Sequence, residues 1–202
     1  MFPFDRFRAG ISLIFDIPIV FPYFTKTIDM TIFVDMDEVI ADTYGAHLKL
    51  YNKEIGANLK IEDCQGKEAW EAVPGQYRDS VKNHARREGF FRALEVIPDS
   101  REVLRELSKV HRVYIATAAM EFPNSLREKS DWLDEHFPFI PWQRRILCGD
   151  KTILRGDLLI DDRSKNLKYF TGRVLMYSSP HNWGNTEFER VDGWGEIAGK
   201  LL

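Results

Sequence analysis

The sequence predicts an α/β fold with a parallel sheet, helices on both faces of that sheet, and a small helical insertion. Short apolar runs, each about as long as a buried strand, alternate along the chain with segments of helical periodicity. Strands that alternate with helices form parallel sheets whose two faces are covered. The region 46–93 interrupts this order, since it has no strand alternation and is mostly helical in pattern. The sequence has neither an internal repeat nor a low-complexity linker.

The size, charge and cysteine content of the chain exclude several classes of protein. At 202 residues the chain can bury a sizeable core, and one domain with an insertion is expected. A net charge of −3 gives no electrostatic footprint for a nucleic-acid polymer or an anionic membrane, so neither is an expected partner. Cys64 and Cys148 are too few for a disulfide scaffold and lack metal-ligand spacing. A reducing compartment, the cytoplasm, is therefore expected.

Residues 1–29 differ in character from the rest of the chain. They are rich in Phe and Ile, but Asp16, Pro18 and Pro22 interrupt them, and no run approaches the ~20 apolar residues of a membrane span. They also lack the basic start, apolar middle and small-residue cleavage site of a secretory signal. Met30 stands directly before the first predicted strand. We expect residues 1–29 to be a dispensable N-terminal extension; an added strand or a partner-binding arm is the alternative.

The remaining chain divides into a core of residues 30–45 and 94–202 and an insertion of residues 46–93. The elements expected in the core are, in order, strand 31–34, a helix from 43, a helix from 100, strand 113–116, helix 124–137, strands 146–148, 158–160 and 174–177, and helix 194–202. In helix 124–137, Leu126, Leu133 and Phe137 are predicted to form the buried face, which Lys129 shares. A lysine there must either pair with an anion or extend to water.

The insertion contains two patterns that bear on its structure. Trp70, Val73, Tyr77 and Val81 recur at helical spacing, with a Pro-Gly break at 74–75 between helices. The basic run 82–87 is most simply a solvated helix face.

The first predicted strand ends in two aspartates, Asp35 and Asp37, separated by one residue. In an extended segment residues i and i+2 share a face, so both carboxylates can aim at one point beyond the strand. Two carboxylates that close repel unless a cation or a proton lies between them, and Mg²⁺ prefers oxygen ligands. The alternative is an acidic turn whose Asp caps the next helix.

Further polar signals fall after other strands or on the inner face of a helix. They are Thr117, Lys129 and the pair Asp161 and Asp162. In open parallel sheets the ligand crevice lies outside the carboxyl ends of the strands, which these residues can reach. Metal-binding carboxylates, a hydroxyl and a lysine together describe a phosphate site. A free carboxylate can then attack phosphorus and form an aspartyl-phosphate.

In this order, Asp35 and Asp37, Thr117, Lys129 and the Asp161-Asp162 pair resemble the four motifs of the haloacid dehalogenase superfamily. The segments 34–42, 89–91, 150–152 and 157–163, with His181-Asn182, resemble the 5′(3′)-deoxyribonucleotidases more closely. The resemblance covers about 31–200 and implies a Rossmann-like core with a helical cap, a homodimer, and Mg²⁺-dependent hydrolysis of (deoxy)ribonucleoside monophosphates through an aspartyl-phosphate.

The resemblance also implies a role for each matching residue. Asp35 would be the nucleophile and Asp37 the general acid, then the base that activates water. Mg²⁺ would be held by Asp35, the backbone carbonyl of Asp37, and Asp162. Thr117 and Lys129 would bind the phosphoryl group. In a supporting layer, Asp161 would fix Lys129 or a metal-bound water, and Lys151 would pair with a carboxylate.

The sequence departs from the family pattern at several positions. Glu38 stands where the superfamily usually has Gly. We expect it either to change the loop or to point at solvent or at the insertion. Glu121 stands near a position where the nucleotidases often have Lys. Thr43 replaces a usual Phe, and Trp70 lies where aromatic residues usually line the base pocket. Phe91 is the clearest candidate for stacking on a base.

Three other functions are compatible with parts of this pattern. A phosphatase for another small phosphorylated metabolite would use the same chemistry, because the fold alone does not fix the substrate. A signalling receiver domain also places an acidic pocket, Thr and Lys on a parallel sheet, but its adjacent acidic pair comes early in the chain. A non-catalytic phosphate-binding protein is disfavoured by the retention of Asp35, Asp37, Lys129 and Asp162.

Overall fold

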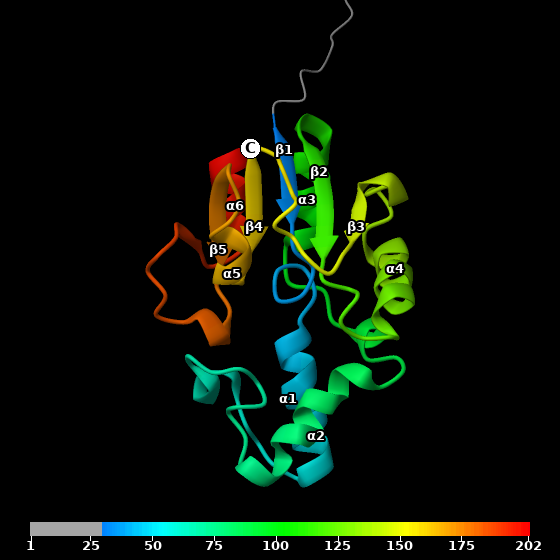
Figure 1. Cartoon of the computed structure of the whole chain (residues 1–202), viewed down its shortest axis with the longest axis vertical. Helices are drawn as coiled ribbons and strands as arrows, with labels where there is room; N and C mark the ends of the chain where they lie inside the picture. Colours follow the sequence, from blue (N-terminus) through cyan, green and yellow to red (C-terminus); the bar gives the residue numbers. More distant parts are fainter. Residues whose placement is uncertain (1–29) are drawn as a thin grey trace, which may run out of the picture.

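A computed structural model describes residues 30–202 and has a single parallel sheet (Figure 1). The six strands lie in the order β3-β2-β1-β4-β5-β6, and every neighbouring pair is parallel. Their bounds are β1 Thr31–Val34, β2 Arg112–Thr117, β3 Arg145–Leu147, β4 Leu158–Asp161, β5 Arg173–Tyr177 and β6 Arg190–Val191. The predicted Rossmann-like sheet is confirmed. The short edge strand β6 was not predicted, because a two-residue strand carries no periodic signal. The expectation for residues 1–29 lies outside the described residues.

The first predicted strand is central to the sheet. β1 pairs with β2 on one side and β4 on the other, with Val34 opposite Ile115 and Ile160. A strand covered on both faces must be apolar throughout, as the run Thr31–Val34 is. The ladder continues one residue further, where the backbone N–H of Asp35 donates to the carbonyl of Ile160 at 2.9 Å. Asp35 is therefore fixed at the carboxyl end of the central strand.

Helices cover the sheet. The core helices are α3 Ser100–Val110, α4 Ser125–His136, α5 Ser164–Leu167 and α6 Trp194–Leu201. The bounds of α3, α4 and α6 agree closely with the expected ones, whereas the short α5 was not predicted. α3 packs against both β2 and α6. Within α4, Ser125, Glu128, Lys129, Trp132 and Leu133 are buried, which is the spacing of one helix face. Leu126 lies off that face and is 37% exposed, so its predicted burial is wrong.

The insertion lies below the carboxyl ends of the strands in Figure 1. Its α-helices are α1 Thr43–Ile55 and α2 Arg78–Lys82, and much of the rest forms 3₁₀ turns: η1 Ile61–Cys64, η2 Gly75–Tyr77, η3 Asn83–Arg86 and η4 Phe91–Ala93. Two further 3₁₀ turns, η5 Trp142–Arg144 and η6 Pro180–Asn182, belong to the core. A separate apolar cluster holds the insertion together, formed by Tyr44, Leu48, Tyr51, Cys64, Ala69, Val73 and Val81.

Two expectations for the insertion need correction. The expected break at Pro74-Gly75 is present, but no helix precedes it, because Trp70 lies in a turn and Val73 in a bend. The basic run is not a fully solvated face, since His84 and Ala85 are buried. Ala85 packs into the main core, and the His84 ring stacks on His47. Over residues 30–202, no helix has the length and apolar character needed to cross a membrane.

Candidate active site

The structure brings the predicted site residues together at the carboxyl edge of the sheet. Parallel strands end at the same edge, so residues far apart in the sequence meet there. The aspartates after β1, the threonine that ends β2, the pair at the end of β4 and two lysines contribute: Asp35, Asp37, Thr117, Asp161, Asp162, Lys129 from α4 and Lys151 from the loop after β3.

Lys129 connects the first two motifs. Its Nζ lies 2.5 Å from Asp37 Oδ2 and donates to Thr117 Oγ1 at 3.0 Å. Its side chain is only 1% exposed, so this lysine pairs with an anion rather than extending to water. Asp37 is 31% exposed and also accepts a hydrogen bond from Thr43 Oγ1 at 3.3 Å. An ammonium, a hydroxyl and a solvent-facing carboxyl thus lie within contact of one another, as phosphoryl binding requires.

Lys151 joins two buried carboxylates. Its Nζ lies 2.6 Å from Asp35 Oδ1 and 2.7 Å from Asp161 Oδ2. Asp161 also accepts hydrogen bonds from Asn166 Nδ2 at 3.0 Å and from the backbone N–H of Arg163 at 2.8 Å. Of the two roles expected for Asp161, contact with Lys129 is wrong, because Asp161 pairs with Lys151 instead. The other role, fixing a metal-bound water, stays a prediction. Asn166 was not anticipated from the sequence, where a single amide in a helix gives no distinguishing signal.

Asp162, the other member of the acidic pair, has a carboxylate oxygen without a hydrogen-bond partner among residues 30–202. This oxygen is Oδ2, and it is buried. The nearest charged or ionisable groups are His181 Nε2 at 3.3 Å and Arg163 Nε at 3.4 Å. Oxygens of Asp35, Asp161 and Asp162 all lie within 4.8 Å of one another. This buried acidic cluster fits a divalent cation, and the unsatisfied Asp162 is a better ligand than Asp161, whose oxygens already accept hydrogen bonds.

The electrostatics of the cluster also favour a cation. Burial raises the pKa of Asp35 to about 6, with Lys151 opposing and Asp161 adding to the shift. Burial and the neighbouring Asp161 likewise raise the pKa of Asp162 well above its usual range. Burial disfavours the charge on Lys151, but the carboxylates of Asp35 and Asp161 outweigh it and raise the pKa of this lysine. A divalent cation would relieve the same repulsion and return the carboxylates to their ionised form.

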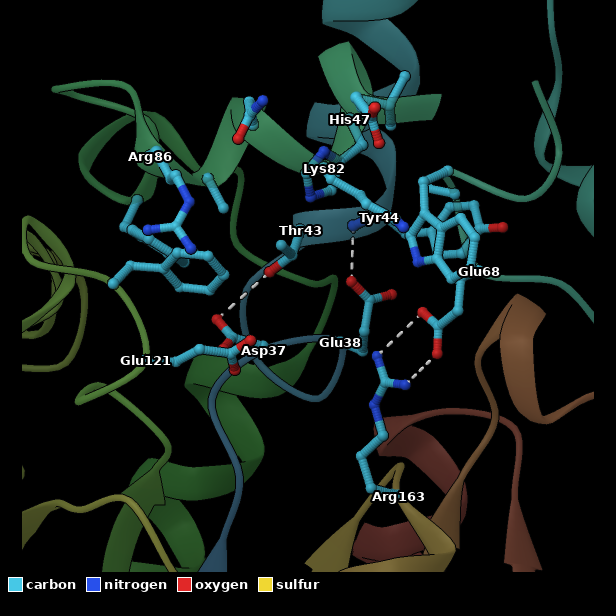
Figure 2. Close-up of a pocket in the computed structure, with 18 residues that line it drawn as sticks. Asp37, Glu38, Thr43, Tyr44, His47, Glu68, Lys82, Arg86, Glu121 and Arg163 are labelled. Carbon is cyan, nitrogen blue, oxygen red and sulfur yellow. Dashed lines mark hydrogen bonds and ion pairs between the residues drawn. The ribbon is translucent and has the colours of Figure 1, made fainter. Parts of the chain in front are cut away.

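A cavity of about 640 Å³ lies between this edge and the insertion, as Figure 2 shows. A second cavity of about 580 Å³ shares Asp37 and Trp70 with it and reaches Asp35 and Asp162. Thr43 and Trp70 line the first cavity, as do Lys82 and Arg86 from the basic run. Lys82 Nζ lies 3.8 Å from the centre of the Trp70 ring. Lys82 and Arg86 were not predicted to belong to the site, because a run of basic residues is typical of a solvent-facing helix.

Phe91 contributes to the cavity wall but is not available for stacking. It is 2% exposed, and its ring packs at 5.1 Å from Phe90 and 5.7 Å from Phe122. Lys129 Nζ lies 4.7 Å from the ring centre. The prediction that Phe91 stacks on a base is therefore wrong, since neighbouring side chains occupy its ring faces. Among the aromatic residues considered from the sequence, Trp70 remains accessible from both cavities.

The two acidic departures from the family pattern occupy different positions. Glu38 has a left-handed backbone with φ of 63° and is buried against the insertion. Its carboxylate accepts a hydrogen bond from the backbone N–H of Tyr44 at 2.6 Å. Burial, with a contribution from Asp42, raises the pKa of Glu38 to about 8. Glu121 lines both cavities and therefore faces the space that a substrate would enter.

Comparison with known proteins agrees with this geometry. A model of the family described as 5′ nucleotidase, deoxy (pyrimidine), cytosolic type C protein matches residues 29–202. A 5′(3′)-deoxyribonucleotidase of Bacillus subtilis is 38% identical over 171 residues, which cover 84% of this chain and 96% of the relative. A Staphylococcus epidermidis relative, which carries that enzyme name provisionally, is 42% identical over 164 residues, covering 81% of this chain and 91% of the relative.

Solved structures with low sequence identity show the same fold. A haloacid dehalogenase-like hydrolase of Streptococcus pneumoniae has a TM-score of 0.54 at 12% identity, covering 88% of this chain and all of that one. A hydrolase of the same superfamily from Bacillus subtilis, solved with bound magnesium, has a TM-score of 0.52 at 14% identity and covers 85% of this chain and 97% of its own. The chain has the fold of haloacid dehalogenase-like hydrolases. It belongs to the 5′(3′)-deoxyribonucleotidase family and is a hydrolase of phosphoric monoesters.

Proposed function

We propose that this enzyme is a Mg²⁺-dependent nucleotidase that dephosphorylates (deoxy)ribonucleoside monophosphates through an aspartyl-phosphate on Asp35. The observation that carries the proposal is the arrangement around that carboxylate. Among residues 30–202, Lys151 Nζ and the backbone N–H of Met36 both contact Oδ1 of Asp35. Both contacts leave Oδ2 of Asp35 free of a hydrogen-bond partner within the described part of the chain, so this oxygen can attack phosphorus.

Asp37 is placed to move the proton that the reaction requires. Attack by Asp35 Oδ2 forms an acyl-phosphate bond and breaks the bond between phosphorus and the ester oxygen. When a substrate phosphoryl group takes over Lys129 as its partner, Asp37, partly exposed to the cavity, can carry the proton that it gives to the leaving oxygen. Lys129, 2.5 Å away in the structure, stabilises the resulting carboxylate. The same carboxylate then takes a proton from the water that hydrolyses the intermediate.

The phosphoryl group would be held from two sides. Lys129 and Thr117 lie on one side and share a hydrogen bond of 3.0 Å, so both are positioned before substrate arrives. On the other side, Asp35, the backbone carbonyl of Asp37, and Asp162 would hold Mg²⁺. The ion would neutralise charge on the phosphoryl oxygens when bound. Lys151 and Asp161 keep Asp35 in place, in line with the supporting roles expected from the resemblance.

The insertion would recognise the leaving nucleoside. We propose that residues 46–93 act as a cap over a core of residues 30–45 and 94–202. Support comes from the separate apolar cluster of residues 44–81 and from the cavity between the two parts. Trp70 offers a planar surface for a base, and Thr43 lies beside Asp37 at the start of the cap. A closed cap excludes water and strengthens the electrostatic interactions around phosphorus.

Phosphate release from a panel of monoesters tests the proposal. The panel contains deoxy- and ribonucleoside 5′- and 3′-monophosphates, sugar phosphates and an aryl phosphate, each assayed with Mg²⁺ and with excess chelator. The deoxynucleotides should have the highest kcat/KM, chelation should abolish turnover, and Asp35→Asn should remove both activity and the acyl-phosphate. Full activity in chelator would contradict the metal assignment. A preference for sugar phosphates would favour the alternative of a general metabolite phosphatase.

Two further expectations from the sequence belong to this proposal. Cys64 and Cys148 are free thiols, as a protein of the reducing cytoplasm would have. Fractionation of cells that produce the protein checks that location. The family resemblance also predicts a homodimer, and light scattering on the purified chain measures its mass in solution.

A further inference from the structure

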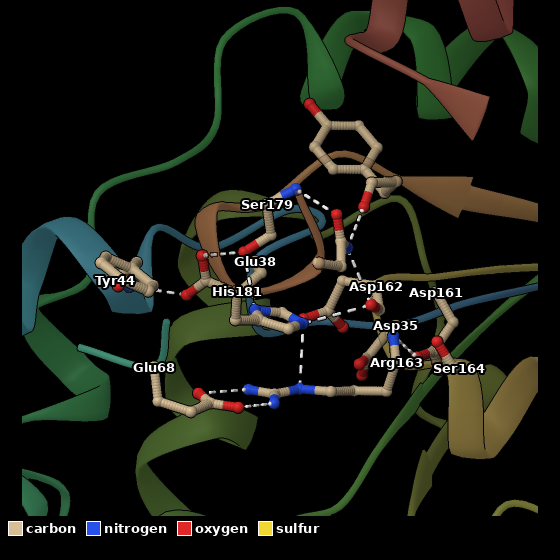
Figure 3. Close-up of polar contacts among 12 residues, drawn as sticks. Asp35, Glu38, Tyr44, Glu68, Asp161, Asp162, Arg163, Ser164, Ser179 and His181 are labelled. Atoms are coloured by element: carbon tan, nitrogen blue, oxygen red, sulfur yellow. Dashed lines mark hydrogen bonds and ion pairs between the residues drawn. The ribbon is translucent and has the colours of Figure 1, made fainter. Parts of the chain in front are cut away.

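A continuous set of polar contacts leads from the buried acidic cluster to the cap, as Figure 3 shows. His181 Nε2 lies 3.3 Å from Asp162 Oδ2, and His181 Nδ1 lies 2.9 Å from Ser179 Oγ. Ser179 Oγ in turn lies within hydrogen-bond distance of Glu38 Oε2, at 3.3 Å. The other oxygen of Glu38 accepts from the backbone N–H of Tyr44, in the first turn of α1. We call Glu38, Ser179 and His181 the relay.

The relay is almost entirely withdrawn from solvent. Glu38 and Ser179 are buried, and the His181 side chain is 8% exposed. Polar groups with so little access to water are costly unless each finds a partner. Here each member contacts the next, so the position of one side chain constrains the others.

The backbone of Glu38 indicates that its position is imposed by this environment. A non-glycine residue at φ of 63° is uncommon, and such a conformation persists when the surrounding structure holds it. The carboxylate contacts to Tyr44 and Ser179 supply that constraint. A glycine at this position would adopt the same backbone conformation readily but would make neither contact.

We propose that Glu38, Ser179 and His181 are positioning residues that orient the Asp162 carboxylate for the divalent cation and fix it relative to the cap. Partners one layer outside a metal site orient its ligands and tune its affinity. Asp162 Oδ2 has no hydrogen bond of good geometry in residues 30–202. His181 Nε2 lies 3.3 Å from this oxygen and 3.2 Å from the backbone carbonyl of Asp162, so it contacts both the side chain and the main chain of the proposed ligand. The inference rests on the metal site proposed above.

The Ser179 side chain takes part in a capping box at the start of η6, but the loop after β5 is also held by contacts that do not involve its hydroxyl. Asn182 Nδ2 donates at 2.8 Å to the carbonyls of both Asp162 and Tyr177. The carbonyl of Pro180 accepts from the backbone N–H of Gly66 in the cap, also at 2.8 Å. Removal of one hydroxyl should therefore leave the loop in place, which makes Ser179 the residue of choice for a test.

The test measures Mg²⁺ binding to the full chain by titration calorimetry, without substrate. Ser179→Ala should raise the Mg²⁺ dissociation constant about ten-fold, within the range typical of such supporting partners. The matched control is Ser178→Ala, since the hydroxyl of Ser178 contacts Asp192 at 2.5 Å and Arg190 at 3.0 Å instead of the relay. In the activity assay, excess Mg²⁺ should restore kcat of Ser179→Ala, with KM for the nucleotide unchanged.

Variants of Glu38 give an independent arm should Ser179→Ala fail to fold. Glu38→Gln keeps an acceptor for Tyr44 and gains an amide that can donate to Ser179, so Mg²⁺ affinity should be close to wild type. Glu38→Gly should lose affinity as Ser179→Ala does. Asp99→Gly is the backbone control, because exposed Asp99 also has φ of 63°, and its Mg²⁺ affinity should not change.

Asp162→Asn separates failure of the relay from failure of the metal site. If Asp162→Asn abolishes Mg²⁺ binding while Ser179→Ala and Glu38→Gly bind as tightly as Ser178→Ala, the relay has no positioning role. If Asp162→Asn binds Mg²⁺ like wild type, the proposed metal site itself is wrong. Weaker binding by Ser179→Ala and Glu38→Gly, with binding retained in Glu38→Gln, supports the proposal.

Discussion

Replacement of Lys151 by Met should destabilise the protein and make its stability strongly dependent on Mg²⁺. The ammonium lies 2.6 Å from Asp35 and 2.7 Å from Asp161, and all three side chains are buried. With Asp162 the cluster contains three carboxylates and one ammonium. Met has a similar length and no charge, so Lys151→Met leaves the carboxylates without their cation.

The size of the effect follows from the burial of the pair. Removal of one partner from a buried ion pair costs about 3–5 kcal/mol, because the remaining charge is uncompensated. For a chain of this size, each kcal/mol lowers the melting temperature by about 2–4 °C, so a fall of roughly 6–20 °C is expected. Saturating Mg²⁺ should recover part of this loss, since a cation that binds only the folded state stabilises it by about 2.7 kcal/mol at 100 times its dissociation constant.

Urea denaturation in chelator and in Mg²⁺ measures both effects. Lys151→Met should gain at least about 1 kcal/mol more from Mg²⁺ than wild type, because Mg²⁺ then supplies charge that the lysine no longer does. Lys168→Met is the control, since Lys168 is exposed and its loss should change stability by less than about 0.5 kcal/mol. A loss below about 1 kcal/mol, or equal stabilisation of both proteins by Mg²⁺, would refute this reasoning.

Four other predictions address catalysis, substrate binding, pH and the N-terminal segment. Asp37→Asn should lower kcat by ~10²–10⁴ for a nucleotide but less for an aryl phosphate, whose leaving group needs no proton; equal losses in stopped-flow assays would indicate a structural role. Trp70→Ala should lower kcat/KM about ten-fold for a deoxynucleotide and little for an aryl phosphate, whereas Phe91→Ala should cost about 3–5 kcal/mol of stability and affect both substrates alike. Burial, assisted by a neighbouring histidine, lowers the pKa of His47 to about 4, so the unfolded chain takes up a proton below pH 6.5 that the folded chain does not. The contribution of His47 to stability should therefore fall by about 2 kcal/mol from pH 7 to pH 5, so the difference in stability between the wild type and His47→Gln should change by about that amount between urea titrations at the two pH values. A chain that begins at Met30 should remain soluble and active, and loss of either property would show that residues 1–29 are required.

The catalytic edge could be predicted because its signals are local. An apolar run followed by Asp35 and Asp37 specifies a buried strand that ends in two carboxylates, whatever surrounds it. The position of Lys129 on the inner face of α4 follows from helical periodicity in the same way. Parallel strands then bring these local signals to one edge, as the structure has them.

The pairing of side chains could not be predicted, because periodicity gives the face of an element and not its neighbour. Asp161 faces Lys151 rather than Lys129, and that choice depends on how the loop after β3 crosses the sheet edge. Phe91 was predicted to be accessible to a base, but the packing of η4 against α4 buries it. Leu126 was misassigned for a related reason, since the buried stripe of α4 begins one residue earlier.

The sequence by itself determined five of the six strands, the longer core helices, and the residue types that a phosphate and a metal require. Tertiary structure alone decided where Glu38 points, since its left-handed backbone and its contact with Ser179, 141 residues away, exist only in the folded chain. The physical reason is that contacts between distant segments depend on the packing of whole elements, and packing is set by shape and burial that no local pattern encodes.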